Sequence, residues 1–230
     1  MATSKLVAPR WHTALLVALF LVLALSGTLF QRQAHARPAT LSEHPDVLRL
    51  YLSLIAMEWG LFLYVWKGGL RRTGTKLRDL IGGIWRSPAD VAVDAGLAAG
   101  LWTAYMIVDK GIDRWLMPSQ AASIQTLLPR RVGEILLWIG VSVSAGICEE
   151  LVFRGYFQKQ FEAFTSSGWI ALILQAALFG IAHGYQGLEA CFRIAVYGVM
   201  FGLLALWRGS LRPGMIAHSG TDILSGIFGI

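Results

Sequence analysis

Charged residues are scarce in this sequence of 230 residues. They make up 15% of it, whereas 55% of the residues are hydrophobic. A soluble domain carries roughly 25% charged residues, so this chain has too little polar surface to cover a water-exposed globule. The composition excludes an ordinary soluble domain and predicts an integral membrane protein, with the lipid bilayer as its partner.

The sequence also lacks the features that commonly divide a chain or cross-link it. Its two cysteines, Cys148 and Cys191, lie in apolar sequence, so buried free thiols are expected and no disulfide framework is implied. It has no internal repeat, no low-complexity stretch and no long linker. The His-Glu-x-x-His motif of zinc peptidases and the Gly-x-Ser-x-Gly elbow of serine hydrolases are absent as well. The length suits one compact bundle.

The net charge of +6 would by itself suggest a nucleic-acid partner. The basic residues, however, occur in short stretches between apolar runs, which is typical of the loops that join membrane spans. The distribution of charge therefore argues against nucleic-acid binding.

Apolar runs of about the length that crosses a bilayer, roughly 20 residues, recur along the whole chain. We interpret seven of them as membrane-spanning helices, at residues 13–30, 47–66, 88–108, 132–161, 169–183, 190–207 and 215–230. The expected fold is an all-α polytopic transmembrane helix bundle with about seven spans.

The first apolar run has two readings. The segment Ala34-His35-Ala36 loosely fits the cleavage site of a signal peptide. The run is nevertheless about as long as a full span and further spans follow, which favours a retained first helix.

The loop at residues 67–86 is the most basic in the chain. The positive-inside rule places it in the cytoplasm, and the N-terminus, with Lys5 and Arg10, falls on the same side. The alanine- and arginine-rich composition favours the cytoplasmic membrane of a bacterium.

Three ionisable residues lie within the fourth predicted helix, although such side chains are costly in a bilayer and usually mark function. Glu150 and Arg154 are four residues apart, so they share a helix face and can pair. Glu149 is rotated by about 100° from Glu150. One carboxylate can therefore be held by Arg154 while Glu149 faces a cavity.

Two histidines complete a candidate site. Helix lengths place Glu149, His183 and His218 at a similar depth, where they can line one cavity reached from the cytoplasm. Phe179 precedes His183 by four residues, and His218 precedes Asp222 by the same interval. Each pair therefore shares one face of its helix.

These residue types suggest hydrolysis. Glu149 would take a proton from water, His183 would position that water, and His218 with Asp222 would stabilise the oxyanion of a tetrahedral intermediate. Glu149, His183 and His218 are also the ligand types of an open catalytic zinc site. The residue types alone leave a metal-free and a metal-dependent mechanism open.

Three motifs stand in order on apolar helices: Glu149-Glu150-x-x-x-Arg154, Phe179-x-x-x-His183 and His218-x-x-x-Asp222. Their series resembles that of the CPBP glutamic-type intramembrane proteases, which include the type II CAAX prenyl endopeptidases and the Abi-type proteins of bacteriocin processing or self-immunity. The resemblance covers residues 132–230, the expected protease core. Residues 1–131 form N-terminal helices without a recognised motif.

The resemblance implies a role for each motif. Glu149 and His183 would activate water, Glu150 and Arg154 would organise the site, and the last motif would form the oxyanion pocket. A membrane-associated protein or peptide would be the substrate, either a prenylated CAAX protein or, in a bacterium, a leader peptide or membrane anchor. The family has been described both as metalloproteases and as metal-independent proteases, so a divalent ion such as zinc stays open.

Asp222 departs from the family pattern, because the last motif commonly ends in Asn. An aspartate accepts hydrogen bonds but donates one only when it is protonated. The oxyanion role of this position therefore needs a proton that an asparagine would not need.

Two other functions fit the same residues. A proton-coupled transporter could relay protons through the buried glutamates and histidines, and a non-catalytic immunity or scaffold protein could retain the fold and its motifs.

Glu58 and Asp94 are further acids in predicted spans, where each would pair with an arginine of another helix or line the cavity. Arg193 is expected to anchor the sixth span at the membrane interface.

Overall fold

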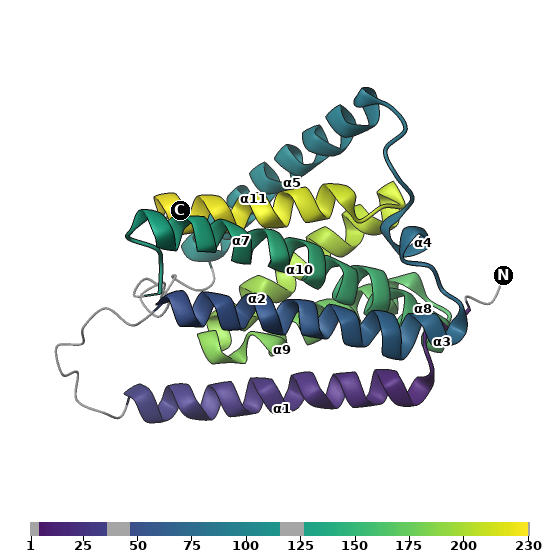
Figure 1. Ribbon diagram of the computed structural model, residues 1–230, viewed down its shortest axis with the longest axis horizontal. Coiled ribbons are helices and arrows are strands. Elements are labelled where there is room, and N and C mark those ends of the chain that lie inside the picture. The colour runs from purple at the N-terminus through teal and green to yellow at the C-terminus, as the bar shows by residue number, and fades with distance from the viewer. Residues whose placement is uncertain (1–4, 36–46, 116–126, 230) are drawn as a thin grey trace.

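A computed structural model describes residues 5–35, 47–115 and 127–229 (Figure 1). Within these ranges the regular structure is helical and contains no strand, so the predicted all-α fold is confirmed. The main helices are α1 (Arg10–His35), α2 (Val47–Leu63), α5 (Pro88–Trp115), α7 (Val132–Glu149), α9 (Gly168–Ala182), α10 (Leu188–Arg208) and α11 (Arg212–Phe228). The shorter elements are η1 (Tyr64–Leu70), α3 (Arg71–Thr73), α4 (Leu77–Ile81), η2 (Glu150–Phe157), α8 (Gln158–Thr165) and η3 (Gly184–Gln186).

Five continuous helices in the described part of the chain are long and apolar enough to cross a membrane. They cover Arg10–Leu29, Val47–Thr73, Pro88–Trp115, Val132–Thr165 and Leu188–Arg208. The other two main helices, α9 with 15 residues and α11 with 17, are shorter than a usual span. The count of seven spans stays a prediction.

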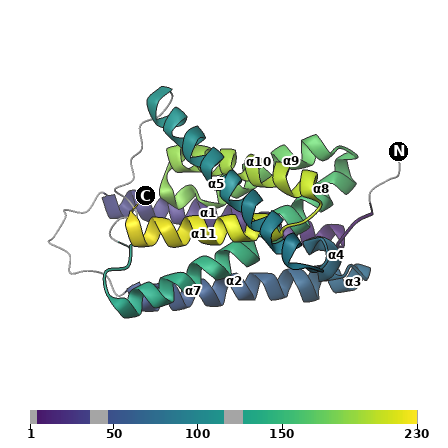
Figure 2. The same ribbon diagram turned by 90° about the horizontal axis from the view of Figure 1, so that it is seen from above.

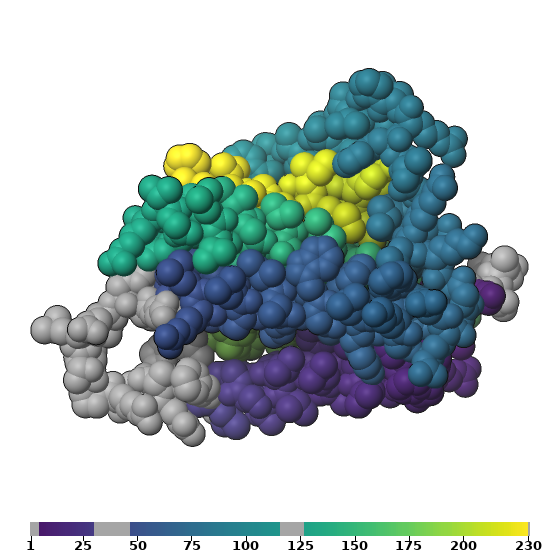
Figure 3. All heavy atoms as spheres, in the orientation of Figure 1, coloured from purple at the N-terminus to yellow at the C-terminus, as the bar shows by residue number. Residues whose placement is uncertain are grey.

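The bundle is apolar on its surface and polar at several points inside. Large hydrophobic side chains are exposed along α1, such as Leu15 and Val22, as a lipid-facing helix requires. In contrast, His12 and Asp94 are completely buried. Helices α1, α2 and α7 form successive bands across one face (Figure 3), and α5 crosses α11 obliquely (Figure 2).

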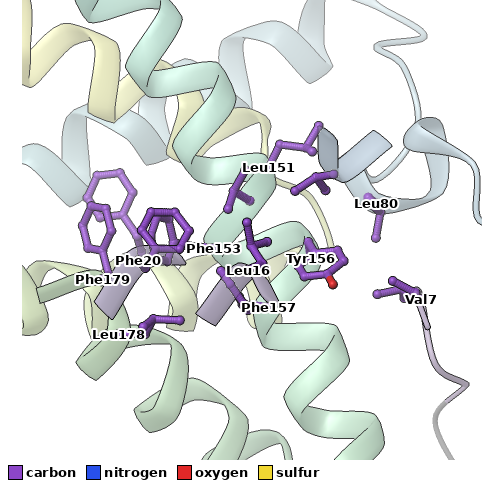
Figure 4. Packing of buried hydrophobic residues seen from close by; sticks show 14 of the residues in the cluster. Val7, Leu16, Phe20, Leu80, Leu151, Phe153, Tyr156, Phe157, Leu178 and Phe179 are labelled. Carbon is purple, nitrogen blue, oxygen red and sulfur yellow. The ribbon is translucent and has the colours of Figure 1, made fainter. Parts of the chain in front are cut away.

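The core is centred on η2, a π-helical turn whose eight residues are all buried. Phe153 lies 5.1 Å from Phe20 of α1 and 4.7 Å from Phe179 of α9 between ring centroids, and Figure 4 shows the three rings grouped together. The hydroxyl of Tyr156 lies 2.8 Å from Nδ1 of His12. The first helix is thus part of the core.

Two buried charges join helices through ion pairs. Asp94 of α5 pairs with Arg208 and Arg212, each at 3.0 Å, so the expected pairing with arginines of another helix is confirmed. The interfacial role expected for Arg193 stays a prediction. Arg193 is buried and forms ion pairs with Asp109 and Asp113 of α5, at 2.7 and 2.6 Å, which tie α10 to that helix.

A glycine allows α7 and α11 to cross closely just before the glutamates. A Cβ atom at Gly146 would lie 2.8 Å from the backbone nitrogen of Ser219 and 3.0 Å from the carbonyl oxygen of Met215. Both distances leave no room for a methyl group. Small residues at such crossings let membrane helices approach each other.

We expect Gly146→Ala to lower the free energy of unfolding by about 1–3 kcal/mol, the usual cost of overpacking. Gly140→Ala on the same helix is the matched control, because its Cβ would make an ordinary contact of 3.5 Å with Ile55. The unfolding midpoints of the two purified variants in detergent check this expectation. Equal midpoints would contradict a close crossing at Gly146.

Candidate active site

The candidate site lies where α7 passes into η2 and meets α11. Glu149 ends α7, Glu150 begins η2, and Arg154 follows one turn later. α11 brings His218 and Asp222 to the same place. The structure therefore gathers five of the six predicted residues into direct contact with one another.

The carboxylate of Glu150 contacts two side chains, those of Arg154 and His218. Its Oε1 atom lies 3.0 Å from Nη1 of Arg154 and 3.1 Å from Nδ1 of His218. The side chains of Glu150 and Arg154 are at most 1% exposed. The pairing predicted from their spacing is confirmed, and the buried negative charge of Glu150 has a partner on each side.

Aromatic rings enclose the guanidinium group of Arg154. Its central carbon lies 4.2 Å from the ring centroid of Phe179 and 5.5 Å from that of Phe201. A cation over an aromatic face is stabilised by the quadrupole of the ring, and more so where water is excluded. Phe179 thus contributes to the site through its ring as well as through the helix that carries it.

His218 is surrounded by carboxyl groups. Besides Glu150 at Nδ1, it has Glu149 Oε2 and Asp222 Oδ2 each 3.7 Å from Nε2. Tyr197 approaches the imidazole edge-on, with ring centroids 5.7 Å apart. One histidine therefore joins all three acids of the predicted motifs.

The two adjacent glutamates differ in their surroundings. The side chain of Glu149 is 15% exposed, whereas that of Glu150 is 1% exposed and bound by Arg154. Glu149 makes no ion pair with Arg154 in the described part of the chain. Of the two carboxyl groups, that of Glu149 is the more exposed.

His183 lies apart from this cluster. It ends α9, its Nδ1 is 2.8 Å from the carbonyl oxygen of Phe179, and its ring packs edge-on against that of Phe179 at 4.9 Å. The Phe179 ring is in turn 6.3 Å from that of His218. Among the described residues, His183 forms no hydrogen bond or ion pair with Glu149. Because Nδ1 donates to the carbonyl oxygen, Nε2 carries the free lone pair.

The side chains do not fit the zinc site that the residue types left open. In the ranges that the structure describes, no three His, Cys, Asp or Glu side chains are grouped so that they could hold a metal ion. Glu149, His183 and His218 therefore do not form a ready-made ligand set.

The expected cavity is not among the surface hollows of about 600 and 640 Å³ that the described residues form. The first lies between α1 and α8, lined by Thr13 and Phe161 among others, and the second lies at the start of α5 beside Trp85. None of the six predicted residues lines either hollow.

One buried acid was not assigned a role from the sequence. Glu58 of α2 is buried, and its Oε2 atom has no hydrogen-bond partner among the described residues. The signal was present in the sequence as a lone acid in an otherwise apolar span. What the sequence lacked was any indication of which helix faces it.

The comparisons with known proteins agree with the motif series. Residues 131–224 match the family model described as "Type II CAAX prenyl endopeptidase Rce1-like". No curated protein and no solved structure matched the chain. With the five helices of span length, the match supports an integral membrane protein whose residues 131–224 are similar to this family.

Removing the arginine alone should leave a buried, poorly compensated carboxylate. We expect Arg154→Met to lower the free energy of unfolding by about 3–5 kcal/mol. Adding Glu150→Gln to this variant should restore part of the loss, because the neutral amide needs no cation. Equilibrium unfolding of the single and double variants in mixed micelles measures the coupling, and strictly additive effects would contradict a direct ion pair.

Proposed function

We propose that this protein, whose residues 131–224 match the Rce1-like type II CAAX prenyl endopeptidase family, is an intramembrane endopeptidase that uses a glutamate to activate water. The observation that carries the proposal is the pair of unlike glutamates. Glu150 is neutralised by Arg154 and His218, whereas Glu149 beside it is more open and lies 3.7 Å from His218.

In the proposed reaction, Glu149 accepts a proton from water as the oxygen attacks the carbonyl carbon of the scissile peptide bond. The carbonyl oxygen becomes an oxyanion in the tetrahedral intermediate. Glu149 then returns the proton to the leaving nitrogen as the carbon–nitrogen bond breaks. The free Nε2 of His183 is suited to accept a hydrogen bond from the water before the attack.

His218 and Asp222 are proposed to stabilise the oxyanion. With both ring nitrogens protonated, His218 donates from Nδ1 to Glu150 and offers Nε2–H to the oxyanion. Asp222 assists only in its protonated form, because a carboxylate has no donor. Glu150 and Arg154 fix the orientation of the imidazole and do not meet the substrate.

The proposed orientation has the site open to the cytoplasm. The N-terminal end of α1 and the basic segment that contains α3 and α4 lie at the same end of the bundle (Figure 1). Both carry the positive charge expected of cytoplasmic segments. The composition supports the cytoplasmic membrane of a bacterium, where a leader peptide or a membrane anchor is the proposed substrate in place of a prenylated CAAX protein.

We expect Glu149→Gln to abolish cleavage while leaving expression and fold intact, because the amide cannot accept the proton of water. Comparing protein termini in membranes from cells with wild type or the variant, at equal expression, would reveal the substrate as termini lost in the variant. Matching terminus profiles together with a retained cellular phenotype would favour an immunity or scaffold protein. Substrate flux in proteoliposomes would favour a transporter.

A further inference from the structure

The hollow of about 600 Å³ between α1 and α8 is an apolar groove outside the candidate active site. Phe161 and Phe164 of α8 line one side of it. On the other side, Ala14 and Ala18 are exposed and lie four positions apart, on one face of α1. The small side chains of these alanines leave the space that the groove occupies. We call it the α1–α8 groove.

The α1–α8 groove follows α1 for about the depth of one membrane leaflet. Its lining residues on this helix extend from Arg10 to Leu21, which are eleven positions apart, or about 16 Å at the usual rise of a helix. The hydrocarbon core of a bilayer is about 30 Å thick. The groove therefore has the length of an acyl chain and about half the length that a transmembrane helix of a partner protein would need.

The N-terminal end of the groove is positively charged. Arg10 lines it and is exposed, and the part of the chain that the structure describes gives its guanidinium group no carboxylate partner. The first turn of α1 contains no acidic residue, so the positive end of the helix dipole adds to this charge. A guanidinium group binds a phosphate through two parallel hydrogen bonds. The charge at this end of the groove thus complements a phosphate group.

A tryptophan indicates the level of this charge in the membrane. Trp11 follows Arg10 and is exposed, and the guanidinium carbon of Arg72 lies 5.6 Å from the centroid of its ring. Tryptophan is enriched at the interface between membrane and water, where the phosphate groups of lipids lie. Arg10 is therefore expected at the level of the headgroups, with the part of the groove lined by Ala14 and Ala18 among the acyl chains.

We propose that the α1–α8 groove binds one anionic phospholipid, whose phosphate contacts Arg10 and whose acyl chain lies along Ala14 and Ala18. The acyl chain packs against Phe161, whose ring centroid lies 5.4 Å from that of Phe157. Phe157 belongs to η2, so the bound lipid supports the element on which the core is centred. This inference does not depend on the proposed peptidase function.

Native mass spectrometry of the full chain in mild detergent, with added phosphatidylglycerol or phosphatidylcholine, counts the lipids that stay bound. We expect one tightly bound phosphatidylglycerol per chain and weaker binding of phosphatidylcholine, whose choline group brings a second cation to Arg10. Arg10→Gln should weaken phosphatidylglycerol binding about tenfold, as the loss of a charge-assisted hydrogen bond does. Ala18→Phe should weaken the binding of both lipids, because the ring fills the groove.

Two further variants are matched controls. Lys5→Gln removes a positive charge near the same end of α1, and Val22→Phe adds a ring at an exposed position of α1 outside the groove. Both should bind phosphatidylglycerol as wild type does. The proposal is overturned if Arg10→Gln or Ala18→Phe also binds as wild type does, if either control loses as much as its groove variant, or if phosphatidylcholine binds as tightly as phosphatidylglycerol. A dimer that Ala18→Phe dissociates would assign the groove to a second copy of the chain and would overturn it too.

Thermal unfolding supplies a second measurement. A ligand that binds only the folded state raises its stability. Phosphatidylglycerol should therefore raise the unfolding midpoint of wild type and of both controls by more than it raises those of Arg10→Gln and Ala18→Phe. Equal rises in all five proteins would contradict a site in the groove. Neither measurement uses cleavage, so a failure of the lipid site leaves the peptidase proposal untouched, and loss of the peptidase proposal leaves the lipid site untouched.

Discussion

The buried ion pair between Arg154 and Glu150 is the interaction on which the rest of the site depends. The positive charge of a guanidinium group buried among helices of span length has to be balanced. Here Glu150 supplies the negative charge, and the rings of Phe179 and Phe201 add cation–π contacts. Glu150 also binds His218, so the same charge that compensates the arginine orients the histidine of another helix. Helices α9, α10 and α11 are thereby all placed around one cation of η2.

Local spacing accounts for what the sequence could predict of the site. Residues four apart on a helix face each other, so the pairing of Glu150 with Arg154 followed from their positions alone. The contact between η2 and α11 could be predicted only from the order of the three motifs, which resembles that of a known family. The apolar runs likewise predicted an all-α bundle, because their composition decides what can face lipid.

Contacts between distant helices account for what the sequence could not predict. α2 packs on α7, where Nε1 of Trp59 donates to Oγ of Ser144, and nothing in either segment marks its neighbour. The sequence did not reveal the ion pairs of Arg193, because its acidic partners, Asp109 and Asp113, belong to a different helix. His183 stands at a helix end, where small differences in chain direction decide whether its ring reaches Glu149.

The docking of the N-terminus has a consequence for how the protein is made. The backbone N–H of Val7 is bound by the side chain of Gln160, 153 residues further along the chain, and His12 is bound by Tyr156. During translation α1 enters the bilayer long before these partners leave the ribosome. Until then His12 lacks its partner Tyr156, so the contacts that bury the N-terminal part of the bundle can form only after η2 and α8 have been made.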